Sequence, residues 1–251
     1  MARLEEAIAL EAARAAAALQ AERPQQVRHK GAVDLVTEID LASERAIRDV
    51  LARHTPGIPV LGEEGGGAEN LCTRWVVDPL DGTTNFVHGL PHFGPSVALE
   101  VDGQVVVGVI IDVSRGEVFR ASRGHGAFLN DERMQVSDVD ELQQALVATG
   151  FGYDRGERPG FYLERVERVF RACQGFRRAG AAALDLAWVA AGRLDAYWEF
   201  DLGPWDVAAG GLLVEEAGGV YRSMPGYEAA QRPCPLASNS ALAVAFSNLV
   251  S

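Results

Sequence analysis

The stretch that decides both fold and chemistry is WVVDPLDGTTNF, residues 75–86. Three apolar residues run directly into Asp78, and a second acid, Asp81, follows three positions later. A glycine and two threonines come next. The apolar run predicts a buried strand, and Gly82 would let the backbone approach an anion closely. The pattern therefore predicts two carboxylates at a strand end, beside a loop rich in amides and hydroxyls.

The composition is that of a globular protein with an acidic charge balance. The chain has 251 residues, 48 % of them apolar and 23 % charged, and a net charge of −12. The negative charge makes nucleic acid and anionic membranes improbable as main ligands. Three widely spaced cysteines without a CxxC pair are typical of a reducing compartment. The N-terminus lacks a secretory pattern, and no apolar run approaches the roughly 20 residues that span a bilayer. We therefore expect a cytoplasmic protein.

Periodicity and turn residues predict a mixture of helices and strands. Helices are expected at residues 3–22, 40–54, 160–174, 180–192 and 205–219. Strands are expected at residues 58–64, 74–78, 94–101, 104–113, 116–122, 145–150 and 194–200. Residues 31–40 are expected to be a turn or a short extended piece, and residues 235–250 a strand followed by a helix. Because strict β-α alternation is missing, layered sheets and helices are favoured over a doubly wound sheet.

Acids recur where these elements begin or end. Glu63 and Glu64 end one strand, Asp78 and Asp81 flank the end of another, and Asp206 opens a late helix. Carboxylates gathered at one sheet edge repel one another, and a bound divalent cation would offset that repulsion. Oxygen donors alone suit a hard ion such as Mg²⁺ or Mn²⁺. Two carboxylates with a backbone carbonyl between them can hold two ions roughly 3.5–4 Å apart.

The residues after the second acid complete a possible hydrolytic site. The amides of Gly82 and Thr83 could face an anion, and the Thr83 hydroxyl could orient a water. A pair of metal ions, backbone amides that bind an anion and a positioned water together predict a phosphate monoester hydrolase. Each piece alone has an ordinary interpretation: DPLDG as a turn, GEEGGG as a solvated loop and Asp206 as a helix N-cap. The order of all of them along the chain is what favours the metal site.

With these pieces in place, the sequence resembles the inositol monophosphatase family of Mg²⁺-dependent, lithium-sensitive phosphatases. The resemblance covers about residues 30–240. The matching pieces are VDLVTEID (33–40), LGEE (61–64), WVVDPLDGTTNFVHGLPHF (75–93), RRAGAAALDLAWVAAGRLDAYWEF (177–200) and PWDVAAGGLLVEEAGG (204–219). The continuation after DGT is more similar to the inositol monophosphatase branch than to the adenosine bisphosphate or histidinol phosphate branches.

The resemblance implies the metal ligands. A first ion would be held by Glu63, Asp78 and the backbone carbonyl of Leu80. A second ion would be held by Asp78, Asp81 and Asp206. Two or three Mg²⁺ ions are expected, with Mn²⁺ as a possible substitute.

The resemblance also implies the remaining roles. Thr83 and Glu63 would position and activate the attacking water, with Asp40 orienting Thr83. The amides of Gly82 and Thr83 would bind the phosphate. The sugar-alcohol pocket would be lined by Asp81, Ala182, Glu199 and Asp206. No Cys or Ser stands in a nucleophile motif, so we expect water to attack phosphorus directly.

The implied fold is α+β, a layered α-β-α-β-α sandwich, usually a homodimer. The chain is expected to form a single domain, with a metal-binding half at about 1–143 and a second half at about 144–251. The expected function is hydrolysis of inositol monophosphate or a similar small phosphorylated polyol. Two alternatives stay open: histidinol phosphate or another small ester as substrate, and an added role in binding the transcription machinery, as in some bacterial members of the family.

Overall fold

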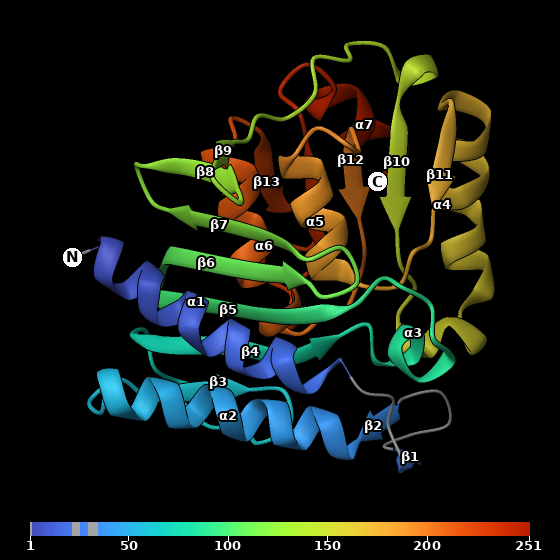
Figure 1. The fold of residues 1–251 in the computed structure, drawn as a ribbon. Helices are drawn as coiled ribbons and strands as arrows, with labels where there is room; N and C mark the ends of the chain where they lie inside the picture. The colour runs from blue at the N-terminus through green and yellow to red at the C-terminus, as the bar shows by residue number, and fades with distance from the viewer. Residues whose placement is uncertain (1, 22–25, 30–34) are drawn as a thin grey trace.

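Helices and sheets stack in five layers (Figure 1). The structure is a computed structural model that describes residues 2–21, 26–29 and 35–251. In these residues two helices cover a larger sheet, two more lie between that sheet and a smaller one, and two cover the outer face of the smaller sheet. The predicted α-β-α-β-α order is therefore present. The predicted pieces at residues 22 and 31–34 fall outside the described residues.

The larger sheet belongs to the first half of the chain. Its strands run in the order β3-β4-β5-β6-β7-β8-β9, and only the β3–β4 pair is parallel. Their bounds are β3 Val60–Gly62, β4 Arg74–Asp81, β5 Gly94–Val101, β6 Gln104–Asp112, β7 Glu117–Ser122, β8 Gly126–Leu129 and β9 Glu132–Arg133. Helices α1 (Ala2–Leu19) and α2 (Glu38–His54) pack on one face. A short antiparallel pair, β1 (Val27–His29) and β2 (Leu35–Thr37), precedes α2.

The smaller sheet belongs to the second half. Its strand order is β11-β10-β12-β14-β13. The bounds are β10 Leu146–Thr149, β11 Gly175–Arg177, β12 Ala196–Trp198, β13 Val220–Ser223 and β14 Pro235–Ser238. Helices α4 (Pro159–Ala172) and α7 (Ala243–Val250) lie on its outer face. Short helical turns occur at η1 (Leu142–Gln144) and η2 (Tyr153–Gly156), and α3 (Thr83–His88) follows β4.

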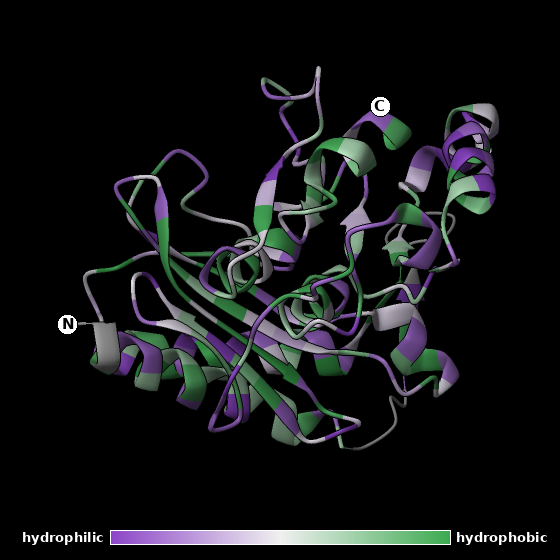
Figure 2. Ribbon diagram, turned by 90° about the horizontal axis from the view of Figure 1, so that it is seen from above, coloured by the Kyte–Doolittle hydropathy of each residue, from purple (hydrophilic) through white to green (hydrophobic). Residues whose placement is uncertain are grey.

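The central layer, α5 (Ala182–Ala190) and α6 (Pro204–Glu216), joins the two sheets through one continuous core. Both helices are apolar on nearly every side, which is the pattern of a fully buried helix, and Figure 2 shows hydrophobic colour along the central strands and helices. Glycines permit the close packing: a Cβ at Gly108 would lie 2.9 Å from Ala209 Cα, and one at Gly210 would lie 2.6 Å from Leu186 Cβ. A single domain stays a prediction, supported by this shared core.

Four predicted boundaries that bear on the site need correction. The strand expected at 58–64 covers only Val60–Gly62, so Glu63 and Glu64 lie in the turn that follows it. The strand expected at 74–78 continues to Asp81. The helix expected from residue 40 begins at Glu38, because Thr37 caps it. The helix expected from residue 205 begins at Pro204 with Gly203 as its N-cap, so Asp206 is the third helical residue rather than the cap. Its carboxylate still serves the helix start by accepting the Gly203 amide at 2.6 Å.

Among the described residues, every helix is too short or too polar to cross a membrane. The three cysteines are free thiols: Cys72 is exposed, Cys173 half-buried and Cys234 buried.

Candidate active site

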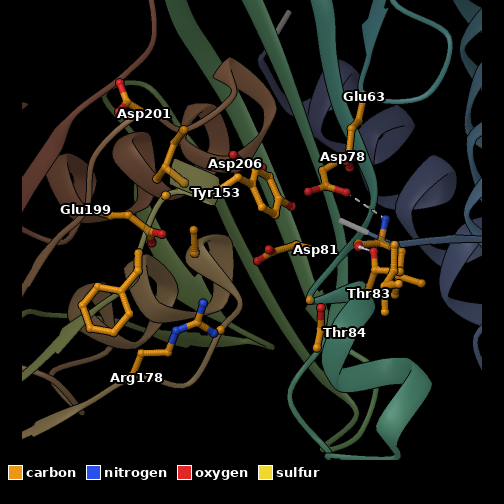
Figure 3. Close-up of a pocket in the computed structure, with 18 of the residues that line it drawn as sticks. Glu63, Asp78, Asp81, Thr83, Thr84, Tyr153, Arg178, Glu199, Asp201 and Asp206 are labelled. Atoms are coloured by element: carbon orange, nitrogen blue, oxygen red, sulfur yellow. Dashed lines mark hydrogen bonds between the residues drawn. The ribbon is translucent and has the colours of Figure 1, made fainter. Parts of the chain in front are cut away.

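A cavity of about 560 Å³ is lined by residues from both halves of the chain (Figure 3). It contains every residue that the resemblance assigned to metal or substrate. These are Glu63, Asp78, Leu80, Asp81, Gly82, Thr83, Ala182, Glu199 and Asp206. Asp40 does not line the cavity; it is fully buried and hydrogen-bonded to Thr83.

A buried carboxylate positions the turn that carries Glu63. Glu44 on α2 accepts the backbone amides of Glu64 at 2.8 Å and Gly65 at 2.9 Å. Arg48, one turn later, donates to Glu44 at 2.8 Å. The glycine in LGEE makes room for this arrangement, since a Cβ at Gly62 would lie 2.6 Å from the Glu44 carboxyl carbon. The turn after β3 is therefore held from the side opposite the cavity.

The two aspartates of DPLD stand on a bulge. Asp78 pairs with Ser96 and Asp81 with Gly94, so β4 has one residue more than β5 in this interval. Pro79, which has no N–H to give to a ladder, sits where sheets tolerate proline. Asp78 Oδ1 accepts the Leu80 amide at 2.9 Å. Figure 3 shows both carboxylates pointing into the pocket.

Gly82 links the bulge to α3 in a conformation that favours glycine. Its φ is +86°, and a Cβ there would lie 2.9 Å from the His92 carbonyl oxygen. Asn85, on α3, donates to the carbonyls of His92 at 2.8 Å and Ala179 at 2.9 Å. The DGTTN segment is therefore tied both to its own half and to the second half of the chain.

Thr83 ends a chain of hydrogen bonds that starts at the N-cap of α2. Its hydroxyl lies 2.9 Å from Asp40 Oδ1 and 3.1 Å from the Leu80 carbonyl. The other oxygen of Asp40 accepts the amide of Thr37 at 2.8 Å and its hydroxyl at 2.5 Å. Burial raises the pKa of the Asp40 carboxyl, while these donors oppose that rise. Asp40 is thus held by Thr37 and offers the Thr83 hydroxyl one of two acceptors within reach, the other being the Leu80 carbonyl.

The second half supplies the opposite wall. The Ala183 amide at the start of α5 donates to Asp81 Oδ2 at 2.8 Å. Glu199 follows β12 and accepts the Tyr197 hydroxyl at 2.5 Å. Gly150, at the end of β10, leaves the space that Glu199 occupies, because a Cβ there would overlap its carboxylate. The position of Glu199 thus depends on the glycine that follows a neighbouring strand.

Burial and mutual repulsion hold the site acids at high pKa in the metal-free protein. The pKa of Asp81 and of Asp206 is raised to about 7, first by burial and then by nearby carboxylates. The pKa of Asp78 is raised well above its usual range by burial, with added repulsion from Glu63, Asp81 and Asp206. Burial raises the pKa of Glu199 to about 8.

The donor set fits a hard cation in chemistry, although its geometry is not that of a preformed site. Within the described ranges, no three His, Cys, Asp or Glu side chains already form a metal-ligating group. The acids nevertheless share one cavity, offer only oxygen, and raise the pKa of one another. Such a cluster is stabilised by a divalent ion with oxygen ligands, and Mg²⁺ requires a near-octahedral arrangement of them. Side-chain rearrangement would be needed to complete the coordination shell.

The metal-free protein is expected to lose thermal stability as the pH rises from 5 to 8. Asp81, Asp206 and Glu199 have folded-state pKa values above their ordinary values near 4. Their contribution is therefore complete below the unfolded pKa and is lost as pH rises through the folded one. Each kcal/mol lost should lower Tm by about 2–4 °C in a chain of this size. Melting curves in EDTA measure this.

The control for the pH series is Asp81→Asn, which should flatten the fall of Tm between pH 5 and 8. A wild-type Tm that is constant or rises over this interval, or an equal slope in the two proteins, would contradict the raised pKa of the cluster.

Sequence reasoning missed much of the outer part of the pocket. Its additional lining residues are Leu35, Thr84, His88, Phe151, Gly152, Tyr153, Arg155, Arg178, Gly180, Asp201, Leu202 and Arg232. Leu35 and Arg178 lie inside quoted motifs, and Asp201 follows Glu199 by two residues. Residues 151–152 and Arg232 lie in loops and residues 153–155 in the short turn η2, and their composition gave no signal.

Comparison with known proteins agrees with this arrangement. The profile of the Inositol monophosphatase family matches residues 2–247. The chain belongs to the inositol monophosphatase family. The resemblance found in the motifs is therefore confirmed over almost the whole chain.

Members of the family with different names are similar to this chain. Nus factor SuhB of Pseudomonas aeruginosa is 47 % identical over 206 residues, covering 80 % of this chain and 76 % of that protein. Inositol-1-monophosphatase of Rhizobium meliloti is 47 % identical over 196 residues, covering 77 % and 74 %. Relatives of both names thus stand at the same level of identity.

Solved structures of the inositol monophosphatase family share the fold. The suhB protein of Bartonella henselae superposes with a TM-score of 0.90 at 39 % identity, covering 98 % of this chain and 97 % of that one. Inositol monophosphatase from Anabaena superposes with a TM-score of 0.88 at 40 % identity, covering 99 % and 95 %. The predicted fold class is confirmed.

Proposed function

We propose that this protein is a Mg²⁺-dependent phosphatase that hydrolyses inositol monophosphate or a similar small phosphorylated polyol. The single observation that carries the proposal is the convergence of Asp78, Asp81, Asp206 and Thr83 on one cavity, with Asp40 fixing Thr83. A cluster of acids serving only the fold would have no need of an oriented hydroxyl beside it. The relative named inositol-1-monophosphatase supports the same activity.

In this proposal the acids hold the ions that the chemistry requires. Glu63, Asp78 and the Leu80 carbonyl would hold one ion, and Asp78, Asp81 and Asp206 another. Bound Mg²⁺ would supply an acidified water and charge stabilisation for the phosphoryl group and leaving oxygen.

The protein residues orient the reactants. The Thr83 hydroxyl donates a hydrogen bond to Asp40 and so presents a lone pair to the attacking water. If the Leu80 carbonyl is a metal ligand, Asp40 would be the remaining acceptor of that hydrogen bond. Glu63 would accept the proton of the water, and the amides of Gly82 and Thr83 would hold the phosphate. Attack is then in line on phosphorus, without a protein nucleophile.

Substrate recognition is assigned to the opposite wall. Glu199, Asp81, Ala182 and Asp206 would contact the sugar alcohol. Burial raises the pKa of Glu199 to about 8 in the metal-free protein, and cations bound to the neighbouring acids would favour its ionised form. The ionised carboxylate would accept strong hydrogen bonds from ring hydroxyls. Its bond from the Tyr197 hydroxyl occupies Oε2 and leaves Oε1 for substrate.

The direct test is kcat/KM with Mg²⁺ for inositol 1-phosphate, histidinol phosphate, glycerol 1-phosphate and p-nitrophenyl phosphate. Inositol 1-phosphate is expected to have the highest kcat/KM. LiCl at millimolar concentration should inhibit its hydrolysis, and NaCl at the same concentration should not. A higher value for histidinol phosphate would move the assignment to that branch. Absence of Mg²⁺-dependent hydrolysis of all four would overturn the proposed activity.

Glu199→Gln is expected to penalise inositol 1-phosphate and largely spare p-nitrophenyl phosphate, which has no ring hydroxyls. Losing a hydrogen bond to a charged group costs roughly 1.5–3 kcal/mol, or about 10- to 150-fold in kcat/KM. Glu167→Gln, on the exposed side of α4, is the matched control and should change neither value. Equal damage to both substrates would show that Glu199 does not read the polyol.

A second role is favoured by the relatives named Nus factor SuhB in Pseudomonas aeruginosa and Escherichia coli. We propose, as the alternative, that the chain also binds the transcription machinery. Binding of purified RNA polymerase, measured for wild type and for Asp81→Asn, tests it.

The same material serves for sedimentation, where we expect a homodimer. The proposed compartment is the cytoplasm.

A further inference from the structure

Three arginines line the same cavity as the acids, and all come from the second half of the chain. Arg155 lies in η2, Arg178 directly follows β11, and Arg232 precedes β14. We call them the arginine rim. The metal-binding acids named above come instead from the β3–β4 region and from the start of α6. The pocket therefore has a cluster of acids and, on separate segments, three cations to which the proposed hydrolysis assigns no role, although Arg232 lowers the pKa of Asp206 against the effect of burial.

No arginine of the rim forms an ion pair with an acid of the described residues. Arg155 Nη1 donates to the Gly152 carbonyl at 3.3 Å, and Arg232 Nε to the Leu202 carbonyl at 3.3 Å. By contrast Arg158, three residues after Arg155, is paired with Asp154 and with Asp201. A guanidinium has five N–H donors, so most donors of the rim are available to a ligand.

Arg178 is the best positioned of the three. Figure 3 shows its side chain pointing into the pocket on the side of Glu199. Its guanidinium carbon lies 5.9 Å from the centre of the Phe151 ring. Gly180, with φ +88°, leaves the space for the guanidinium, because a Cβ there would overlap Arg178 Nη1. Gly180 and the Phe151 ring thus help to place the Arg178 guanidinium beside Glu199, the residue assigned to bind substrate hydroxyls.

The charge balance of the pocket gives this cation a use. Bound divalent ions would neutralise the acid cluster and take the scissile phosphate. The rim would then face the distal part of the substrate with positive charge and unfilled donors. Arginine forks match the planar or tetrahedral oxygens of carboxylate and phosphate. We propose that the arginine rim, led by Arg178, is a subsite for a second anionic group, so that phosphate esters with a distal phosphate or carboxylate are preferred. This inference rests on the proposed phosphatase activity.

A competing interpretation assigns Arg178 to the protein itself, as a counter-charge for Glu199. Arg178 does lower the pKa of Glu199 against the effect of burial. In that case Arg178→Gln would harm every substrate that uses Glu199, whether or not it carries a second anion. The two interpretations therefore differ in selectivity rather than in total activity.

The test compares two substrate pairs that differ by one anionic group: inositol 1,4-bisphosphate against inositol 1-phosphate, and 3-phosphoglycerate against glycerol 1-phosphate. Wild type should favour at least one doubly anionic member by about 10-fold in kcat/KM, the low end for a hydrogen bond to a charged group. Arg178→Gln should remove most of that preference, and Arg178→Lys should keep part of it. Preference in only the first pair would assign the subsite to phosphate; in only the second, to carboxylate.

The neighbouring Arg177→Gln is the matched control, because Arg177 is exposed and donates to the Phe176 carbonyl without lining the cavity. It should keep the wild-type preference. No preference in wild type, or an equal loss for both members of each pair in Arg178→Gln, overturns the subsite.

Calorimetry separates failure of the subsite from failure of the activity. Both members of each pair are titrated into Mg²⁺-loaded Thr83→Ala protein, with and without Arg178→Gln. If no ester is hydrolysed by wild type but the doubly anionic ligands bind more tightly through Arg178, the phosphatase proposal fails and the subsite stands. Equal affinities within each pair overturn the subsite independently of turnover.

Discussion

Replacing Thr83 with alanine is expected to lower kcat by about 10²-fold or more, with little change in KM. The hydroxyl that Asp40 orients at 2.9 Å is assigned to the attacking water. Its interaction therefore matters mainly in the transition state, and general acid–base assistance of this kind contributes roughly 10²–10⁴-fold. A loss confined to kcat is the signature of an interaction absent from the ground state. Steady-state kinetics with inositol 1-phosphate and saturating Mg²⁺ measure it.

Thr83→Ser is the control, because it keeps the hydroxyl and removes one methyl group. It should retain most of the wild-type kcat. Melting temperatures of all three proteins show whether the alanine variant is folded. A folded Thr83→Ala protein with a near-wild-type kcat, or with a raised KM alone, would remove Thr83 from the role of water-positioning residue.

Asp81→Asn is expected to abolish Mg²⁺ binding at the second metal site, which Asp81 would form with Asp78 and Asp206, and with it nearly all activity. Asparagine can still accept the Ala183 amide that Asp81 accepts at 2.8 Å, so the local structure should persist while one charge is lost. Saturation at 100 times Kd would stabilise wild type by about 2.7 kcal/mol, or roughly 5–10 °C in Tm for this chain length. The variant should show a smaller rise, from the ion assigned to Glu63, Asp78 and the Leu80 carbonyl alone. Without metal it should melt higher than wild type, because one repelling carboxylate is gone.

Calorimetric titration with Mg²⁺ measures the same loss directly. Asp131→Asn serves as the control, since Asp131 is fully exposed and lies outside the cavity. It should bind Mg²⁺ like wild type. Equal Mg²⁺ binding by wild type and Asp81→Asn would exclude Asp81 from the ligand set.

Prediction from sequence succeeded where a local pattern determines the structure. The antiparallel strands at 94–122 are separated by clear turn residues, and the buried helices at 180–192 and 205–219 are long apolar runs ended by glycine. It failed at β8, β9, β11 and β13, which have two to four residues each. Strands this short are defined by the neighbours they pair with, and those neighbours are distant in sequence.

The site divides in the same way. The acids and Thr83 could be predicted because WVVDPLDGTTNF and PWD are local motifs with a chemical meaning. The bulge that directs Asp78 and Asp81 into one cavity could not be predicted, because it depends on the register of β4 with β5. Gly150 could not be recognised either, since the carboxylate it accommodates is 49 residues away in sequence, on Glu199. The arginine rim comes from three separate segments and has no motif of its own.

Asp40 has a consequence for how the protein can change during evolution. One of its oxygens completes the capping box of α2 and the other orients the Thr83 hydroxyl. Exchange of a typical catalytic side chain lowers the activity and has little effect on the fold. Loss of a helix cap, by contrast, lowers the stability by about 0.5–2 kcal/mol and has no effect on catalysis. At Asp40 the two effects are inseparable. A descendant selected only for stability or for a binding role would still retain Asp40. The presence of Asp40 in a related chain is therefore not by itself a sign of retained catalytic activity. The presence of Thr83 is such a sign.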